Sequence, residues 1–410
     1  MTTNGYLAAK PRYEILDGLR GVAAIFVVIF HLFEPYSGVS ANQIINHGYL
    51  AVDFFFVLSG FVVGYAYDDR WNKMSLKGFI KRRLIRLHPM VIMGTTIGAC
   101  FFFFSLGNYT SEFAPLWNII LAFIMACFMI PCGKSLDIRG WGEMNSFNGP
   151  NWTLTWEYLA NILYALILRR LPKAILAILL GSAAICTIDL CLNLNIFGLL
   201  TEGRNHQMYT VIGGWSLTAE QLYIGATRLL YPFLCGLLIS KIGKYISVKK
   251  SFWICSIILI GIFSTPCIGG DRSILNGFYN ATAIMIIFPL VVIIGAGGKI
   301  SGKKSINVCK FLGDISYPLY ITHYPLMYTQ FNWAWSHKDA PLYTHIMVAV
   351  GCFVLSLGIA YACTKMADRK ISYLMNMKII IQQDRDNQPS IEKEHFLALM
   401  LQRSNGFCFQ

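Results

Sequence analysis

The chain has 410 residues, of which 55% are hydrophobic and 13% charged, and its formal net charge is +13 at pH 7. With a mean hydropathy of +0.52, this composition excludes an ordinary soluble domain and indicates a polytopic membrane protein. The positive charge would favour a nucleic-acid-binding protein in a soluble chain, but here we attribute it to Lys and Arg in cytoplasmic loops.

The N-terminus is predicted to lack a cleavable signal peptide. Residues 1–17 are polar, and no small-residue cleavage site follows the first apolar run. Apolar segments long enough to approach the span of a bilayer recur along the chain. We count eleven of them: 18–34, 48–66, 89–106, 116–131, 152–168, 174–192, 222–240, 252–268, 275–296, 311–331 and 342–364.

Lys and Arg are unevenly distributed among the loops, and this distribution predicts how the chain is oriented in the membrane. Loop 67–88 holds seven of these residues, whereas loop 35–47 holds none. Cytoplasmic loops are enriched in Lys and Arg, so we expect both termini to be cytoplasmic. Ten crossings fit this assignment if 89–106 or 116–131 is re-entrant or lies along the interface. The predicted fold is thus an all-α helix bundle, with a membrane domain at 1–366 and a polar cytoplasmic tail at 367–410.

The first apolar segment, GLRGVAAIFVVIFHLF, carries two costly polar residues, Arg20 and His31. Eleven residues separate them, so on a helix they lie on one face, about 20° apart in rotation and about 16 Å apart in height. Ionisable residues within a membrane span are functional candidates. Taken singly, Arg20 is also explained as a positive-inside anchor and His31 as a packing residue.

Three later segments also place polar groups at membrane depth. Asp53 lies in GYLAVDFFFVLSGF, Arg228 in ATRLLYPFLCGLL, and His323 among the tyrosines of FLGDISYPLYITHYPLMY. An intramembrane carboxylate needs a partner or a hydrated cavity. Arg228 falls near the outer face, which is the wrong side for a positive-inside anchor. We therefore expect these residues to bind an anionic or sugar-like molecule near the outer face or to line a cavity.

In two further motifs, charged residues lie next to or at the start of a predicted membrane span. In FIKRRLIRLHP, Arg82, Arg83 and Arg86 are clustered, and Arg guanidinium groups suit phosphate geometry. The general enrichment of Lys and Arg in cytoplasmic loops would also explain the number of these arginines. It does not explain why they cluster immediately before an apolar segment. In NWTLTWEYLANILYALI, Glu157 lies among aromatic residues, and a headgroup-level position in an aromatic belt is the competing explanation.

In their order, these stretches resemble the bacterial acyltransferase 3 family of membrane O-acyltransferases, which modify surface polysaccharides. The resemblance is carried by residues 14–33, by GYLAVDFFFVLSGF, KRRLIRLHP, NWTLTWE and TRLLYPFLCGLL, and by LGDISYPLYITHYPL. It covers about residues 13–365. One departure is that a single Glu157 stands where many members have a Glu pair.

The resemblance implies acetyl transfer from cytoplasmic acetyl-CoA to a hydroxyl of a surface or exported saccharide, including a lipid-linked one, at the bacterial inner membrane. Acetyl-CoA is then a substrate, and neither a bound cofactor nor a metal is expected. Four arginines are expected to hold the CoA phosphates: Arg20, Arg82, Arg83 and Arg86. His31 is expected to act as general base or as nucleophile, with Glu157 orienting it or sharing its proton.

Two other classes also use intramembrane polar residues. A proton-coupled transporter of a small molecule or glycan is the main alternative, but we find no inverted repeat to support it. A membrane glycosyltransferase would be expected to place acidic residues in a sizeable outer loop, whereas loop 35–47 has only Glu34 at its edge.

Overall fold

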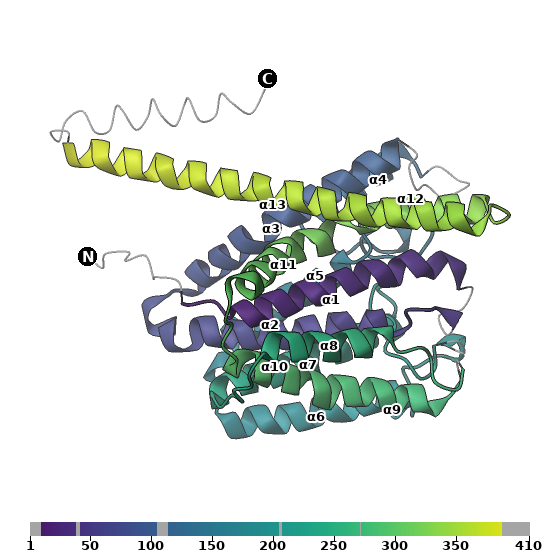
Figure 1. Ribbon diagram of the computed structural model, residues 1–410, viewed down its shortest axis with the longest axis horizontal. Helices are drawn as coiled ribbons and strands as arrows, with labels where there is room; N and C mark the ends of the chain where they lie inside the picture. The colour runs from purple at the N-terminus through teal and green to yellow at the C-terminus, as the bar shows by residue number, and fades with distance from the viewer. Residues whose placement is uncertain (1–9, 38–41, 105–113, 205–206, 271, 388–410) are drawn as a thin grey trace. The chain divides into compact units, whose positions relative to one another are not determined.

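The computed structural model describes residues 10–37, 42–104, 114–204, 207–270 and 272–387, and these residues form helices and connecting loops without a β-strand (Figure 1). The all-α prediction is therefore confirmed. The helices are α1 (Glu14–Phe33), α2 (Ala51–Tyr67), α3 (Leu76–Phe103), α4 (Leu116–Cys127), α5 (Asn151–Leu166), α6 (Lys173–Leu192), α7 (Ala219–Ile242), α8 (Ser251–Ser264), α9 (Ile274–Thr282), α10 (Phe288–Gly297), α11 (Lys303–Thr322), α12 (Tyr324–Ser336) and α13 (Leu342–Asn387).

The chain divides into two compact units between Tyr361 and Ala362. The first unit holds α1 to α12 and the beginning of α13, and everything below concerns this unit. The second unit contains the rest of α13, which continues as helix to Asn387. The tail predicted from residue 367 therefore begins as a helical extension of the last apolar segment.

Seven helical segments in the described part of the chain are long and apolar enough to cross a membrane. This supports a multi-pass membrane protein, while the ten crossings and the sidedness remain predictions. The predicted topology allows only one of the segments 89–106 and 116–131 to cross the membrane, and the helices that contain them differ in length. α3 has 28 residues, whereas α4 has 12, which span about 18 Å. A hydrocarbon core is about 30 Å thick, so α3 is the one of suitable length.

The arginine-rich stretch lies within α3 rather than in a loop. α3 begins just after Ser75, whose Oγ accepts a hydrogen bond from the backbone N–H of Gly78. This N-cap satisfies one of the free donors at the helix start. The helix therefore begins more than two turns before the predicted apolar segment, and its arginines are held on a rigid element.

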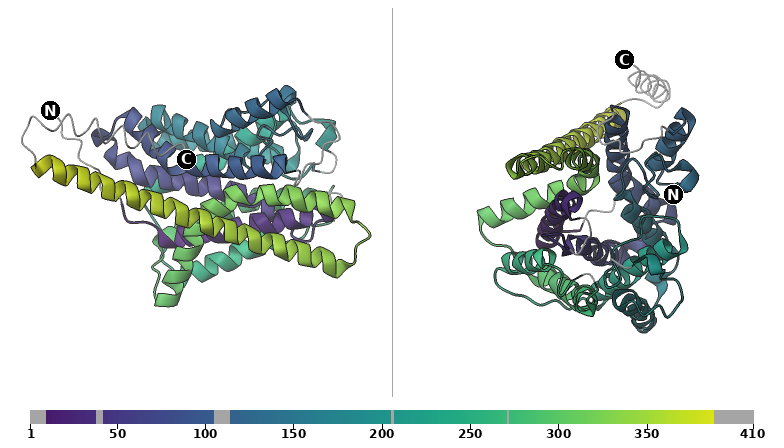
Figure 2. Two further views of the ribbon diagram at one scale, coloured as in Figure 1. Left: turned by 90° about the horizontal axis from the view of Figure 1, so that it is seen from above. Right: turned by 90° about the vertical axis from the view of Figure 1, so that its right-hand side faces the viewer.

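The centre of the first unit consists of α1, α2 and α7. In the end-on view of Figure 2, α1 lies inside the group of helices. At least two-thirds of the apolar stretch of each of these three helices is buried, compared with one-third for α6. α2 and α7 approach closely because a Cβ on Gly60 would overlap the Phe233 carbonyl and one on Gly236 the Val57 carbonyl. Small residues at such crossings are typical of membrane helix pairs.

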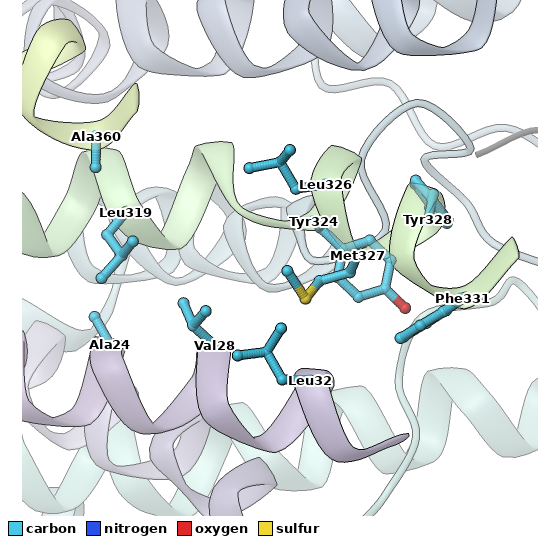
Figure 3. Close-up of a cluster of buried hydrophobic side chains, with 10 residues drawn as sticks. All are labelled: Ala24, Val28, Leu32, Leu319, Tyr324, Leu326, Met327, Tyr328, Phe331 and Ala360. Atoms are coloured by element: carbon cyan, nitrogen blue, oxygen red, sulfur yellow. The ribbon is translucent and has the colours of Figure 1, made fainter. Parts of the chain in front are cut away.

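One face of α1 packs against the α11–α12 region. Figure 3 shows Ala24, Val28 and Leu32, one helical turn apart, facing Leu319 and Met327. This contact fixes the rotation of α1. Arg20 and His31 lie beside this face, where Arg20 reaches Ser316 on α11 and the His31 ring packs against His323 and Tyr324.

The predicted apolar segment 311–331 is not one helix, because α11 ends at Thr322 and α12 begins at Tyr324. Pro325 has no N–H with which to continue the hydrogen bonding to the Ile321 carbonyl. That carbonyl accepts a hydrogen bond from Asn148 Nδ2 instead, at 2.6 Å. A side chain thus replaces the lost backbone donor, as broken helices within membranes require.

Candidate functional site

A cavity of about 170 Å³, here the arginine cavity, lies among α1, α2, α3, α5 and α11. Its wall combines apolar side chains with a small set of polar ones. The polar set that concerns us is Arg20, Ser59, Arg83, Arg86, Glu157 and Ser316. Three of the four arginines predicted to bind the donor therefore border one cavity, although they come from separate motifs.

Arg83 and Glu157 form an ion pair in this wall. Arg83 Nη2 donates to Glu157 Oε1 at 2.7 Å, and Ser59 Oγ donates to the same oxygen at 3.1 Å. Arg83 is 5% exposed, so breaking this pair would leave a buried charge without compensation. The structure thus places Glu157 beside the arginines.

Arg20, Arg82 and Arg86 differ in their surroundings. Arg20 donates to Ser316 Oγ at 2.8 Å and to the Gly313 carbonyl at 3.2 Å. Arg86 borders the cavity, and no ion pair or hydrogen bond to another described residue engages its guanidinium. Arg82 is partly exposed and is not among the residues that line the cavity.

A second and larger cavity of about 510 Å³ contains His31, and we call it the histidine cavity. Its wall includes two carboxyl groups, those of Glu34 and Glu143, and the guanidinium of Arg228. Four of the nine tryptophans of the chain also line it: Trp141, Trp152, Trp215 and Trp335. A wall rich in aromatic side chains, with a few convergent polar groups, is typical of a small-molecule site.

His31 is paired with Glu34, three residues further along the chain. Nδ1 of the imidazole lies 2.7 Å from Glu34 Oε2. A carboxylate can only accept a hydrogen bond, so in the neutral imidazole Nδ1 carries the hydrogen and Nε2 keeps its lone pair. This is the tautomer that a general base or a nucleophile needs. The expected partnership of His31 with Glu157 is not found, since Glu157 borders the other cavity.

His323 lies beside the His31 ring rather than in the cavity wall. The two imidazole centroids are 5.5 Å apart, and the Tyr324 ring packs edge-on against His31 at 4.8 Å. His323 is fully buried, and its Nδ1 lies 2.9 Å from the Tyr320 carbonyl. Because a carbonyl only accepts, Nδ1 is the donor here. His323 therefore supports the position of His31 through packing.

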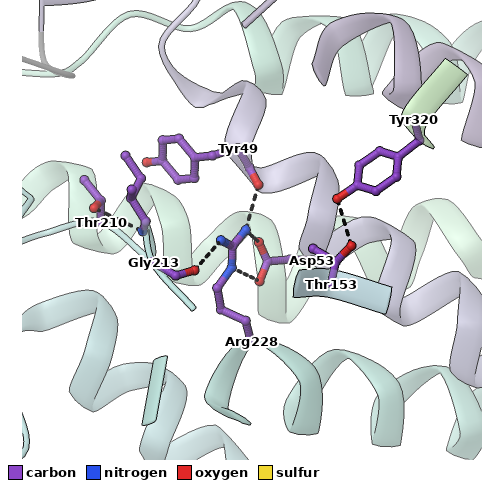
Figure 4. A network of polar contacts seen from close by, with 8 residues as sticks. Tyr49, Asp53, Thr153, Thr210, Gly213, Arg228 and Tyr320 are labelled. Atoms are coloured by element: carbon purple, nitrogen blue, oxygen red, sulfur yellow. Dashed lines mark hydrogen bonds and ion pairs between the residues drawn. The ribbon is translucent and has the colours of Figure 1, made fainter. Parts of the chain in front are cut away.

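Arg228 and Asp53 form a buried ion pair (Figure 4). Arg228 Nη2 and Nε donate to the two carboxylate oxygens of Asp53 at 2.7 and 3.2 Å, and Asp53 is fully buried. The guanidinium also donates to the carbonyls of Tyr49 and Gly213. All three guanidinium nitrogens of Arg228 are therefore engaged within the protein. The pair ties α2 to α7 and a neighbouring loop, and Arg228 also lines the histidine cavity, as expected. Binding of an acceptor by these residues stays a prediction.

The two cavities adjoin. Val52 and Tyr320 line both of them, and the Tyr320 hydroxyl lies 2.9 Å from Thr153 Oγ1, as Figure 4 shows. Arg20 borders the arginine cavity and His31 the histidine cavity, both on α1. The cavity with the arginines therefore borders the cavity with the His31 imidazole, and Val52 and Tyr320 lie in the wall between them.

Sequence reasoning did not identify Glu34, Glu143 or the tryptophan wall as parts of the site. Glu34 was detectable, because its spacing of three from His31 lets the two side chains meet on one helical turn. Glu143 and Trp141 lie in the loop before α5, far in sequence from His31, and only the fold brings them to its cavity.

Residues 13–365 match the acyltransferase 3 family, which is described as an acyltransferase domain. This match covers most of the chain, and the chain belongs to the acyltransferase 3 family. The resemblance drawn from the sequence motifs is thus confirmed.

Relatives with curated names include several O-acetyltransferases. O-acetyltransferase OatA of Staphylococcus aureus is 25% identical over 366 residues, which are 82% of this chain and 54% of that protein. Peptidoglycan O-acetyltransferase OatA of Listeria monocytogenes is 24% identical over 330 residues, 76% of this chain and 49% of that protein. The match thus spans about half the length of these two relatives.

A shorter relative is more similar in sequence. "Protein 2 in picA locus" of Rhizobium radiobacter is 31% identical over 163 residues, which are 38% of this chain and 81% of that protein. No solved structure matches the chain.

Proposed function

We propose that the protein is a membrane O-acyltransferase that moves an acetyl group from acetyl-CoA to a saccharide hydroxyl. One observation carries the proposal: Arg20 and His31, on one helix, border two cavities that adjoin at Val52 and Tyr320. A donor with anionic phosphates and an uncharged arm fits a cationic chamber that leads to an imidazole.

The arginine cavity is proposed to receive the phosphates of the donor. Arg86 is the strongest candidate for a phosphate contact, because its guanidinium is not engaged by the described residues. Arg20 and Arg83 keep the cavity cationic but are oriented by Ser316 and Glu157. Guanidinium groups bind phosphate through charge-assisted, often bidentate hydrogen bonds.

The acetyl transfer is proposed to take place in the histidine cavity with His31 as general base. Nε2 removes the proton of the acceptor hydroxyl, and the hydroxyl oxygen attacks the thioester carbonyl. Collapse of the tetrahedral intermediate breaks the C–S bond, and the CoA thiolate takes the proton from the imidazolium. The products are the acetyl ester and CoA. Glu34 stabilises the imidazolium that forms when His31 takes the proton of the hydroxyl.

Direct transfer is favoured over a covalent acetyl-histidine carrier. A carrier is useful when donor and acceptor cannot reach the same place. Here the two cavities share lining residues, so the thioester and the acceptor hydroxyl are proposed to meet at His31 in one chamber. The base and covalent roles make different predictions, since only the covalent route leaves an acetylated enzyme after acetyl-CoA is supplied without acceptor.

The acceptor is proposed to be a saccharide of the cell envelope. Aromatic faces pack well against the C–H face of a sugar ring, and the histidine cavity has four tryptophans. The relatives include an enzyme named for peptidoglycan O-acetylation, which belongs to the same broad acceptor class. With both termini cytoplasmic, the arginine cavity faces the cytoplasm of a bacterial inner membrane and the histidine cavity lies towards the outside.

Membrane vesicles of both orientations test the proposal. Radiolabelled acetyl-CoA is added to inside-out and right-side-out vesicles that contain the protein, together with envelope polysaccharide from a strain that lacks it. We expect label in polysaccharide when the cytoplasmic face meets acetyl-CoA, and little when only the outer face does. The proposal fails if no label is transferred, and uptake of the saccharide instead would support a transporter.

A further inference from the structure

Glu143 is a carboxyl group in the wall of the histidine cavity that the transfer chemistry has not used. It lies in the loop between α4 and α5, far in sequence from His31. Glu143 is 7% exposed, and it borders the same cavity as His31 and Glu34. A buried carboxyl in a substrate chamber requires an explanation, because burial of a charge without a partner is costly.

One oxygen of Glu143 is held by the protein and the other is not. Tyr328 donates its hydroxyl hydrogen to Glu143 Oε2 at 2.5 Å, and the same hydroxyl accepts the backbone N–H of Gly149 at 3.2 Å. Oε1 has no hydrogen bond to any described residue. It lies against Gly149, where a Cβ would come within 2.5 Å of it, and Gly149 itself lines the cavity.

The surroundings of Glu143 favour its neutral, protonated form. Burial raises the pKa of Glu143 to about 8, and the neighbouring carboxylates Asp137 and Glu34 act in the same direction. The hydrogen bond from Tyr328 and the guanidinium of Arg139, which stacks on the Tyr328 ring at 3.8 Å, lower the pKa, but burial outweighs them.

The remaining charged and titratable groups around the cavity do not reverse this balance. His31 is paired with Glu34, and Arg228 is neutralised by Asp53. Tyr324, which packs on His31 and on the Tyr328 ring, is buried among aromatic side chains. A proton on Glu143 therefore belongs on Oε1, because Oε2 already accepts the Tyr328 hydroxyl hydrogen.

We infer that Glu143, in its acid form, is an acceptor-positioning residue that donates a hydrogen bond from Oε1 to the saccharide in the histidine cavity. This inference rests on the proposed function and adds a property of the acceptor. The acceptor offers an oxygen lone pair to Glu143. The sugar unit that enters is also expected to be uncharged. Arg228, the arginine in the described part of this wall, is paired with Asp53 and cannot pair with an anionic sugar.

The test uses the full-length protein in vesicles, with envelope polysaccharide from a strain lacking the protein as the acceptor probe. The KM values for polysaccharide and for acetyl-CoA are measured separately between pH 6 and pH 9. For the wild type, we expect the polysaccharide KM to rise as the pH passes through about 8 and Glu143 loses its proton. The KM for acetyl-CoA is expected to be independent of this ionisation.

Substitutions separate the role of the proton from the role of the shape. Glu143→Ala removes one hydrogen bond, and we expect the polysaccharide KM at pH 7 to rise about tenfold. Glu143→Gln has an N–H donor at the position of the acid, so it is expected to reverse that rise and to abolish the change near pH 8. Glu202→Gln, an exposed site, is the matched control and should behave as the wild type.

Two kinds of result would overturn the inference while leaving the proposed function intact. In the first, the wild type transfers label but the polysaccharide KM of Glu143→Gln is raised as much as that of Glu143→Ala. An N–H donor would then not replace the acid, and a carboxylate would be required. The other is an alkaline rise in the polysaccharide KM that persists in Glu143→Gln. If the wild type transfers no label at any pH, the proposed function fails and this inference fails with it.

Discussion

The carboxylate of Glu34 lies 2.7 Å from Nδ1 of His31, at the end of the helix that also carries Arg20. This relationship fixes which imidazole nitrogen keeps a lone pair. The His31 side chain is 17% exposed, so it is shielded yet open to the cavity. A carboxylate–imidazole pair of this kind both orients the base and stabilises the cation that forms when it takes a proton.

Glu34→Gln should therefore impair the reaction while leaving substrate binding in place. The amide can donate to Nδ1, which places the imidazole hydrogen on Nε2 and removes the lone pair that the hydroxyl needs. We expect kcat to fall by about 10²-fold or more, the lower end of what general-base catalysis contributes. The measurement is the initial rate of labelled acetyl transfer, with Glu202→Gln as the control. Unchanged kcat in Glu34→Gln would show that the pair has no role in the chemistry.

Arg86→Ala should weaken binding of the donor specifically. Its guanidinium borders the arginine cavity, and its removal breaks no ion pair among the described residues. Loss of one charge-assisted hydrogen bond, worth about 1.5–3 kcal/mol, corresponds to a rise of about 10- to 100-fold in the KM for acetyl-CoA.

Arg82→Ala provides the matched control for Arg86→Ala, since it removes the same charge from the same helix at a position that does not line the cavity. Its KM for acetyl-CoA is expected to stay within about threefold of the wild type. Equal effects of the two substitutions would mean that general positive charge, and not the arginine cavity, attracts the donor.

Asp53→Ala should destabilise the fold. It leaves the buried Arg228 guanidinium without its carboxylate, which typically costs about 3–5 kcal/mol. The thermal midpoint of the protein in detergent is expected to fall clearly, whereas Asp69→Ala, with a side chain that is 62% exposed, should change it little.

A double substitution distinguishes a structural tie from an acceptor contact. Asp53→Leu combined with Arg228→Met replaces the ion pair by apolar side chains, and such replacements are often neutral for stability. We expect the double variant to be more stable than Asp53→Ala. A double variant that remains as unstable as the single one would contradict the assignment of the pair as a simple tie.

The sequence predicted the helical class and the positions of most helices, because long apolar runs have few alternatives in a membrane. It could not predict the break at His323. Pro325 lies inside an apolar run, and only the contact between Asn148 and the Ile321 carbonyl shows how the freed acceptor is satisfied. The start of α3 was also missed, since the charged residues after Ser75 resemble a cytoplasmic loop.

For the site, helix geometry correctly related Arg20 to His31, because both lie on one helix with fixed periodicity. It could not assign partners across helices. Glu157 is paired with Arg83, and Arg228 with Asp53, in each case through contacts between residues at least 70 positions apart. Such pairings depend on packing, which a single sequence does not contain.

The most direct test of the account is the rate of acetyl transfer by His31→Ala, compared with His337→Ala. His337 is an exposed histidine at the end of α12, so the control makes the same substitution away from both cavities. At equal amounts of folded protein in inside-out vesicles, kcat for labelled acetyl transfer to polysaccharide is predicted to fall by about 10²- to 10⁴-fold in His31→Ala and to stay unchanged in His337→Ala. Transfer by His31→Ala at close to the wild-type rate would contradict the account.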